Sequence, residues 1–197
     1  EMCIRDRLNH LAVSNPLRLE IETQFLHAGE VTPAHEALLK TLRERGVTVY
    51  TNTPLLSGIN DSPDEMHQLA YALRQMGMEF HHLYVAGWPL QRQWDPAQAI
   101  TVAEVIDIAS EVRQYGSGRE IPRYIILTAL GEVDFGLTSR FVRHEDQLWV
   151  KLLCYDLDHF KCLDPTYQWP QEVRNDDAGH PMVTVAGLVA DDDFMIR

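Results

Sequence analysis

The sequence has 197 residues, of which 45% are hydrophobic and 23% charged. This composition is typical of one globular domain, or of a domain with an appendage, and it excludes a large fibrous protein and a globally disordered chain. The 17 basic and 29 acidic residues give a net charge of −12, and a field of that sign repels nucleic-acid phosphates and anionic lipids. We therefore expect no nucleic-acid partner and no membrane partner.

Targeting signals and cysteine usage predict the compartment. The chain has no apolar run of the ~18 residues that a membrane span requires, and its charged start lacks the apolar core of a signal peptide. The cysteines Cys3, Cys154 and Cys162 are odd in number and widely spaced, unlike a disulfide framework. These features favour a cytoplasmic protein with reduced thiols. Residues 1–16 follow no periodic pattern and open on Glu1, so we expect a fragment of a longer protein.

Strand-like and helix-like patterns alternate between residues 17 and 128. Strands are expected at residues 17–25, 47–53, 79–85 and 122–128. Helices are expected to begin after the N-caps Thr32, Ser62 and Thr101 and to end at Gly46, Gly77 and Gly116. The last two N-caps belong to capping boxes. This alternation predicts βα units with a parallel sheet, as in half of a barrel.

The connections between these elements are unequal in length. The strand-to-helix loops at residues 54–61 and 86–100 are longer than the helix-to-strand joints, so the functional site is expected at the carboxyl ends of the strands. Residues 129–197 are expected to form a β-rich extension, with a hairpin made by residues 140–143 and 147–156. The tail from Leu163 is poor in regular pattern until residues 182–190, and residues 191–193 form an acidic run. Both the tail and the acidic run are expected on the surface.

Several side chains near these loops are candidates for the site. Asn52 ends its strand before Pro54 and can hydrogen-bond a ligand, with turn capping as the alternative. Of His81 and His82 at most one should face the site, because neighbours on a strand alternate; a hydrogen-bonded core histidine is the alternative. Trp88 and Trp94, with Arg92, are placed to cover a ligand or simply to pack the loop.

A cysteine-containing cluster lies in the extension. It consists of Cys154, Asp156, Asp158, His159 and Cys162. These residue types ligate zinc, but their spacing fits no standard zinc motif. A charged hairpin edge with one buried thiol is the favoured interpretation, and no metal site is assigned.

Four segments together resemble a known family. They are TQFLHAGEVT at residues 23–32, TPLLSGIND at residues 53–61, Tyr84, and YGSGREIPRYIILTALGEVDFGLTSRF at residues 115–141. The stretch from residue 17 to residue 142 resembles the second half of the lysine 2,3-aminomutase family of radical S-adenosylmethionine (SAM) enzymes. The resemblance implies an α/β fold, the second half of a partial (βα)6 barrel, followed here by the C-terminal hairpin extension.

The resemblance also implies cofactors and positions. In the family a [4Fe–4S] cluster cleaves SAM, the 5′-deoxyadenosyl radical abstracts a substrate hydrogen, and pyridoxal phosphate carries the migrating amino group. Gln24 and Asn52 fall near the expected adenosyl group, where the family has His and Gln. We assign His82, Tyr84 and Trp88 to the side of a small-molecule substrate.

Departures from the family narrow the prediction. The C-x3-C-x2-C cluster motif is absent, Asp134 stands where the family has its pyridoxal lysine, and Ser62 replaces a zinc-binding cysteine of some members. Gly87 and Leu127 replace two aspartates that hold the far amino group of lysine. We therefore expect the C-terminal portion of a radical SAM enzyme without pyridoxal phosphate, acting on a molecule other than lysine. It would be inactive without the first barrel half, and a homo-oligomer is compatible with it. A cluster-free binding module is the alternative.

Overall fold

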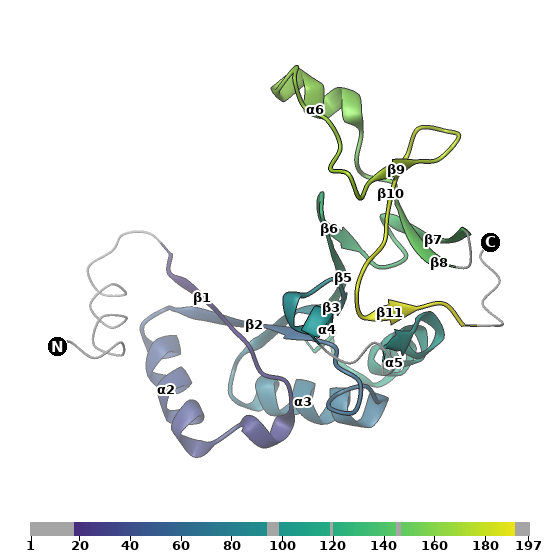
Figure 1. Ribbon diagram of the computed structural model, residues 1–197. Coiled ribbons are helices and arrows are strands. Elements are labelled where there is room, and N and C mark those ends of the chain that lie inside the picture. Colours follow the sequence, from purple (N-terminus) through teal and green to yellow (C-terminus); the bar gives the residue numbers. More distant parts are fainter. Residues whose placement is uncertain (1–17, 94–98, 119, 145–146, 192–197) are drawn as a thin grey trace.

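A mixed five-stranded sheet organises the larger part of the molecule (Figure 1). The computed structural model describes residues 18–93, 99–118, 120–144 and 147–191. Strands β1, β2, β3 and β5 are parallel, and β6 pairs antiparallel with β5 at the edge. In sheet order the strands are β1 (Glu20–Thr23), β2 (Thr48–Pro54), β3 (Glu79–Ala86), β5 (Arg123–Thr128) and β6 (Gly131–Asp134). The α/β class is thus confirmed, while the half barrel stays a prediction with which this open sheet is compatible.

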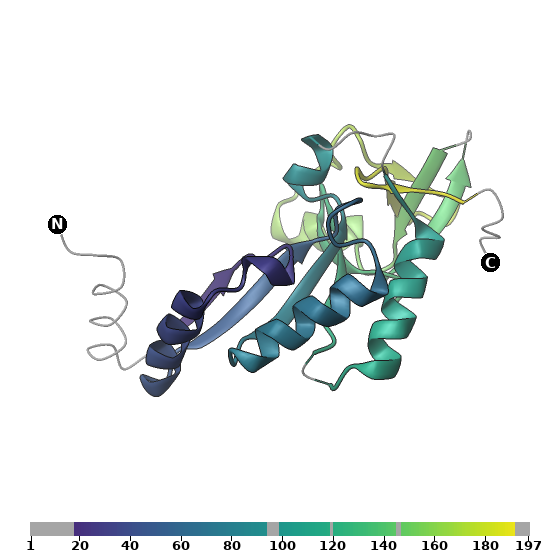
Figure 2. The ribbon, with the colours of Figure 1, turned by 90° about the horizontal axis from the view of Figure 1, so that it is seen from below.

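Three helices cover one face of the sheet, as the view from below shows (Figure 2). They are α2 (Pro33–Glu44), α3 (Pro63–Gln75) and α5 (Val102–Tyr115), and a short 3-10 turn, η1 (Ala28–Glu30), precedes α2. Their apolar stripes meet the sheet in one core that includes Leu69, Leu73 and Val105. Burial of such stripes is what stabilises amphipathic helices.

The helix boundaries follow the predicted caps. The backbone amide of Glu65 donates to the Ser62 hydroxyl at 3.3 Å, and Thr101 and Glu104 form a reciprocal capping box. Gly46 and Gly77 adopt φ angles of +74° and +77°, the left-handed conformation that ends a helix. The predicted helix ends and the box at Thr101 are confirmed. The box predicted at Ser62 is incomplete, because the Glu65 carboxylate accepts from the Ser62 hydroxyl at 2.9 Å and not from its backbone amide.

The long connection between β3 and α5 contains structure that the sequence did not predict. A short helix, α4 (Pro89–Gln93), follows β3, and the two-residue strand β4 (Ile100–Thr101) leads into α5. Strand β4 pairs in parallel with β11 (Leu188–Val189), close to the end of the described chain. The tail was expected on the surface, and for this part the expectation is wrong, because Leu188 is only 5% exposed.

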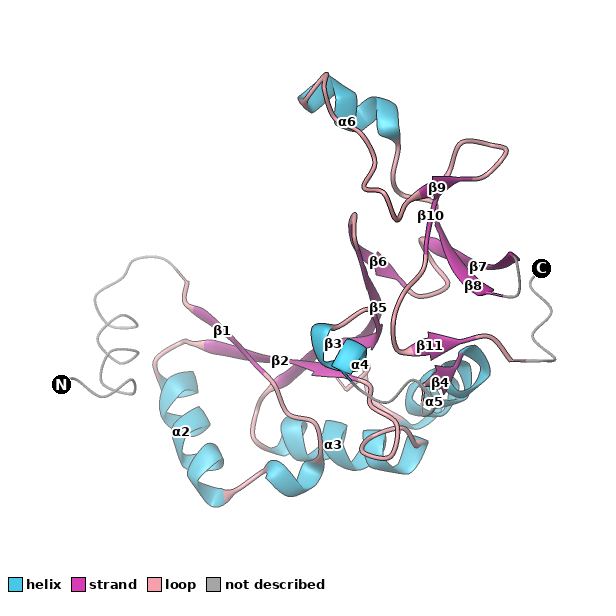
Figure 3. Cartoon of the chain, in the orientation of Figure 1, coloured by secondary structure: helices cyan, strands magenta, loops and turns pink. Residues whose placement is uncertain are grey.

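An antiparallel sheet forms the extension, in the order β7-β8-β10-β9 (Figure 3). The strands are β7 (Ser139–His144), β8 (Gln147–Leu152), β9 (Arg174–Asn175) and β10 (Pro181–Val183). The predicted hairpin corresponds to β7 and β8, which pair along six residue pairs. Helix α6 (Leu157–Leu163) projects away from both sheets and has no buried residue.

Candidate functional site

The sheet face opposite α2, α3 and α5 is polar around the carboxyl halves of its strands. Leu83 and Val85 of β3 belong to the core under the helices, so His82 and Tyr84 point to the opposite face. Val133 of β6 is a core residue in the same way, which places its neighbours Glu132 and Asp134 on the polar face. Residues from several strands therefore converge on one surface.

A β-bulge places two histidines on this face. Thr51 lies opposite Phe80 and Asn52 lies opposite His82, so that His81 is an extra residue in β3. The two imidazole rings stack with centroids 3.9 Å apart and planes at 21°. The expectation that at most one of them could face the site is wrong, because a bulge breaks the alternation on which it was based.

The residues expected near the substrate lie together. The hydroxyl of Tyr84 donates a hydrogen bond to Oε1 of Glu132. The other carboxylate oxygen of Glu132 lies 4.0 Å from Nδ1 of His82, too far for a hydrogen bond. The ring of Trp88 packs against that of Tyr84 with centroids 4.2 Å apart. The structure thus joins His82, Tyr84 and Trp88 into one wall, and their contact with substrate stays a prediction.

Burial shifts the pKa values of His82 and Tyr84 in this wall. The pKa of His82 is lowered, chiefly by burial and further by His81, against an opposing effect of Glu132. The pKa of Tyr84 is raised far above its usual value by burial and by the hydrogen bond to the Glu132 carboxylate. Near neutral pH the face therefore presents a neutral imidazole and a protonated phenol.

Arg123 neutralises Asp134. Its Nη2 lies 3.1 and 3.0 Å from the two carboxylate oxygens and its Nε lies 3.2 Å from one of them. The hydrogen bond to Asp134 also raises the pKa of Arg123. Nη1 of the same guanidinium lies 3.5 Å from Nε2 of His82. Asp134, at the position of the expected pyridoxal lysine, is thus part of an ion pair beside the histidine.

Asn52 does not cap a turn. It is 7% exposed, and its Oδ1 is buried without a hydrogen-bond partner among the described residues. Gln24 directly follows β1 and is exposed, one residue beyond the last β1–β2 pair, Thr23 with Thr51, so it is level with Asn52. The two residues predicted to lie near SAM therefore both lie at the carboxyl ends of the adjacent strands β1 and β2.

The turn-capping role considered for Asn52 is performed by Asn60. Its Oδ1 accepts from the amide of Leu56 at 2.7 Å, and its Nδ2 donates to the carbonyls of Leu26 and Pro54 at 3.0 Å each. The side chain is fully buried. The asparagine of the GIND motif therefore fixes the loop after β2.

Gly87 and Leu127, where the resemblance places the two lysine-binding aspartates, are in contact. A Cβ atom at Gly87 would lie 1.8 Å from the carbonyl oxygen of Leu127. Gly87 also has a φ angle of +86°, which side chains rarely adopt. No carboxylate can be accommodated at this position without rearrangement of the backbone.

Three site residues were not selected from the sequence. Glu132 and Arg123 lie in the quoted motif at residues 115–141, and strand alternation from Asp134 would have placed Glu132 on the same face. Gln91, 4% exposed, joins the loops behind the wall through its carboxamide, and no sequence pattern marked it.

The cysteine-containing cluster is not assembled. Cys154 and Cys162 are both exposed, so the expected buried thiol is wrong. Asp156 instead caps α6 by accepting from the amide of Asp158 at 2.8 Å. In the described ranges no group of three potential metal ligands is found. Cys3 and Trp94 lie outside the described residues.

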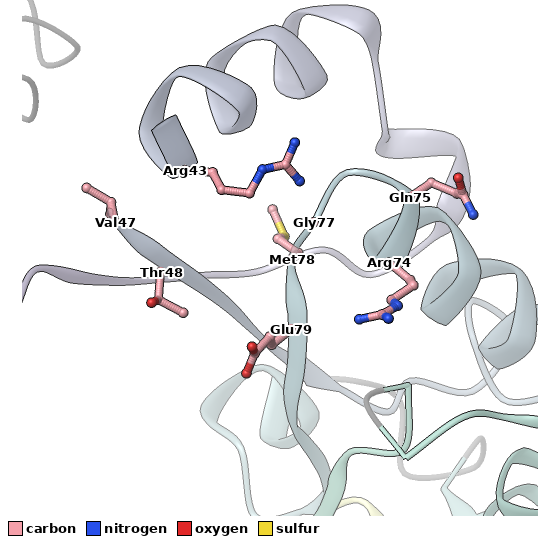
Figure 4. A pocket seen from close by; sticks show the side chains of 8 residues that line it. All are labelled: Arg43, Val47, Thr48, Arg74, Gln75, Gly77, Met78 and Glu79. Atoms are coloured by element: carbon pink, nitrogen blue, oxygen red, sulfur yellow. The ribbon is translucent and has the colours of Figure 1, made fainter. Parts of the chain in front are cut away.

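A separate hollow of about 460 Å³ opens at the amino ends of β2 and β3 (Figure 4). Arg43 and Arg74 line it from the last turns of α2 and α3, where basic side chains interact favourably with the helix dipole. Its position at the opposite ends of the strands separates it from the polar face described above.

Within the described residues, no helix is long and apolar enough to cross a membrane. No family model matches the chain. Curated relatives match part of it: a putative L-lysine 2,3-aminomutase of Aquifex aeolicus is 29% identical over 128 residues, and an L-lysine 2,3-aminomutase of Fusobacterium nucleatum is 29% identical over 111 residues.

The chain is distantly related to lysine 2,3-aminomutases. An L-lysine 2,3-aminomutase of Methanococcus maripaludis is 26% identical over 111 residues. The matches cover 62%, 54% and 54% of this chain but only 32%, 24% and 24% of the respective relatives. The chain therefore matches a quarter to a third of the length of each aminomutase.

Proposed function

We propose that this chain is the C-terminal portion of a radical SAM enzyme resembling lysine 2,3-aminomutase. The complete enzyme would generate a 5′-deoxyadenosyl radical, abstract hydrogen from a small molecule other than lysine, and rearrange it by an amino shift or a related step. The distant relatives support the family, and one feature of the polar face supports a ligand site there. Buried Asn52 Oδ1, His81 Nδ1 and His82 Nδ1 lack hydrogen-bond partners among the described residues.

Unpartnered buried polar atoms are costly, at about 1–3 kcal/mol each, so three of them close together call for an explanation. The other such atoms of the described residues belong to His67, Tyr124, Trp149 and His180. All three lie on adjacent strands β2 and β3. A ligand that supplies donors and acceptors to these atoms would satisfy them. In parallel α/β folds this edge of the sheet is the usual place for such a ligand.

The cysteines of this chain do not fit the iron–sulfur cluster. The sequence contains three, in no C-x3-C-x2-C arrangement, and Cys154 and Cys162 lie exposed on the extension rather than on the polar face. The cluster would have to be held by the missing first half of the barrel, which is the partner that the proposal requires. No step of the reaction is assigned to the cluster here.

Pyridoxal phosphate and a lysine substrate also fit poorly. The chain has three lysines: Lys40 on α2, Lys151 on β8, and Lys161 on α6. None lies on a strand of the five-stranded sheet, and Asp134 is held by Arg123, so no Schiff base can form on the polar face. Gly87 and Leu127 carry no charge that could bind the far amino group of a lysine substrate. These features support the proposal of a substrate other than lysine.

The residues of this chain would bind and orient rather than carry the radical. The carboxamides of Gln24 and Asn52 would hydrogen-bond SAM at the sheet edge. Since the Tyr84 hydroxyl donates its hydrogen to Glu132, the Glu132 carboxylate and the Tyr84 oxygen would both accept from a donor group of the substrate. Trp88 would exclude water from that side.

The test is anaerobic reconstitution of the complete enzyme with its cluster, followed by measurement of 5′-deoxyadenosine. We expect SAM cleavage, and we expect Asn52→Ala to weaken SAM binding about tenfold while leaving unfolding cooperative, as loss of one buried hydrogen bond implies. Tyr50→Phe, near the amino end of the same strand, is the control. Absence of 5′-deoxyadenosine from the cluster-loaded enzyme would overturn the proposal.

A cluster-free binding module is the second candidate, and the continuity of the core favours it. One core cluster extends from Phe25 of the sheet domain to Val183 and Leu188 of the extension. A chain with such a core can fold on its own. Monomeric, cooperative folding of these 197 residues with no SAM chemistry in any longer form would support this reading; aggregation through the β1 edge would contradict it.

A further inference from the structure

The carboxamide of Gln91 joins three segments behind the Tyr84–Trp88 wall. Its Nε2 donates to the carbonyls of Leu55 at 2.9 Å and Tyr84 at 3.0 Å, and its Oε1 accepts from the amide of Trp88 at 2.8 Å. Leu55 follows β2, Tyr84 lies in β3, and Trp88 precedes α4. One buried side chain therefore connects the end of β2, the end of β3 and the loop that carries Trp88.

A segment close to the C-terminus, residues 184–191, packs against Gln91. We call residues 184–191 the C-terminal strap. The carbonyl of Ala186 accepts from the amide of Gly87 at 2.8 Å, and Leu188 is buried where β11 pairs with β4. Asp191 accepts from the amide of Ala103 in the first turn of α5 at 2.9 Å. The strap is thus fixed at several points along the loop that carries Gln91.

Gly187 is the point of closest approach. A Cβ atom at this residue would lie 3.0 Å from Cβ and 3.1 Å from Cδ of Gln91, and its φ angle is +87°. The strap therefore packs against the Gln91 side chain so closely that a methyl group at Gly187 would require a shift of a few tenths of an ångström. Such a shift would act on the carboxamide and its hydrogen bonds.

We infer that Gln91 is a positioning residue through which the C-terminal strap sets the geometry of the Tyr84–Trp88 pair. The inference rests on the proposed function only in treating this pair as part of a ligand site. The strap is separated from the pair by roughly a hundred residues of sequence, yet it forms the back of the same wall. The end of the chain is accordingly part of the site's architecture.

Two glycines provide a matched test. Gly187 and Gly179 have φ angles of +87° and +86°, but a Cβ atom at Gly179 would meet nothing within 4 Å. The variants Gly187→Ala and Gly179→Ala therefore impose the same backbone strain, and only the first one presses on Gln91. Amide hydrogen exchange of the two variants isolates the effect of that contact.

We expect exchange at the amide of Trp88, which donates to Oε1 of Gln91, to be at least tenfold faster in Gly187→Ala than in Gly179→Ala. In a Gln91→Leu background, Gly187→Ala should add nothing at this amide, because the hydrogen bond that it disturbs is already lost. Near-ultraviolet circular dichroism gives a second readout. The signal that Trp88→Phe removes should also be lost in Gln91→Leu, since the packed Tyr84–Trp88 ring pair is its source.

Equal exchange at Trp88 in the two alanine variants would overturn the inference, even if the amide of Gly87 responded through its own bond to Ala186. Retention of the Trp88 signal in Gln91→Leu would overturn it as well. Neither readout needs a cofactor or a substrate. Failure of SAM cleavage would therefore contradict the proposed function and leave this result standing.

Discussion

The hydroxyl of Tyr84 in β3 donates a hydrogen bond to the carboxylate of Glu132 in β6, across the intervening strand β5. The carboxylate also faces His82, while Arg123 of β5 pairs with Asp134 alongside. Acid, phenol, imidazole and guanidinium groups are thus arranged in one row over three strands. Each can be altered separately, and the consequences differ.

Removal of the Tyr84 hydroxyl should cost little stability. Tyr84→Phe keeps the ring that packs on Trp88, and the Glu132 side chain, 41% exposed, can be hydrated instead. We expect a loss of about 1 kcal/mol in the free energy of unfolding, measured in urea. In the complete enzyme kcat/KM should fall about tenfold, the equivalent of one hydrogen bond.

Tyr155→Phe is the control for this variant. The Tyr155 hydroxyl makes a weaker contact, 3.4 Å from the carbonyl oxygen of Glu132. An equal loss of kcat/KM in both variants would show that the Glu132 carboxylate has no special role.

His82 should make stability depend on pH below neutrality. Its pKa is lowered in the folded state from 6.5, so the unfolded chain binds more protons between the folded pKa and 6.5. The stabilising contribution is complete above pH ~6.5 and is lost as the pH falls through that value toward the folded pKa. His82→Gln should flatten this part of the curve of unfolding free energy against pH. His159→Gln, an exposed change on α6, should leave it unchanged.

Asn60 should be among the most sensitive polar positions. Asn60→Ala leaves the Leu56 amide and two carbonyls without their partner inside the protein. We expect a loss of about 3 kcal/mol in unfolding free energy. Asn175→Ala, at an exposed side chain that accepts one bond from Trp169, should cost under about 1 kcal/mol. A loss as small at Asn60 would contradict the role assigned to it.

Gly87 should not accept a side chain. In Gly87→Ala the new methyl group would collide with the carbonyl of Leu127, in addition to the strain of a positive φ angle. Gly136→Ala has similar strain, at φ +73°, but meets nothing within 4 Å, so it should cost only about 1 kcal/mol. Thermal unfolding should show a much lower Tm for Gly87→Ala. Equal Tm values would mean that the Leu127 carbonyl can move aside.

Local signals predicted most of the elements of this fold. Caps such as Ser62 and Thr101 act within one helical turn, and Gly46 and Gly77 end helices through their own φ angles, so the order of strands and helices follows from neighbouring residues. Strand β11 escaped prediction because two residues pairing with β4 leave no periodic pattern. Its pairing depends on contacts distant in sequence.

The candidate site was predicted only in part, because some of its residues are positioned by contacts that are distant in sequence. The resemblance and the strand ends led to Asn52, His82 and Tyr84, which the structure places on one face. The bulge at His81 was not foreseen, since alternation assumes a regular ladder. Gln91 was missed because its importance comes from three backbone groups on separate segments, none of which has a sequence signature.

Because His81 is the extra residue of the bulge, its deletion would not shift the pairing of the other residues of β3 with β2. Phe80 faces the core and His82 the opposite face, so a chain lacking His81 would alternate regularly from Phe80 to Val85 and pair with β2 without interruption. Every other side chain of β3 would keep its face. Deletion of the His81 codon would therefore remove one imidazole from the polar face of the sheet. The residues of the core would stay the same.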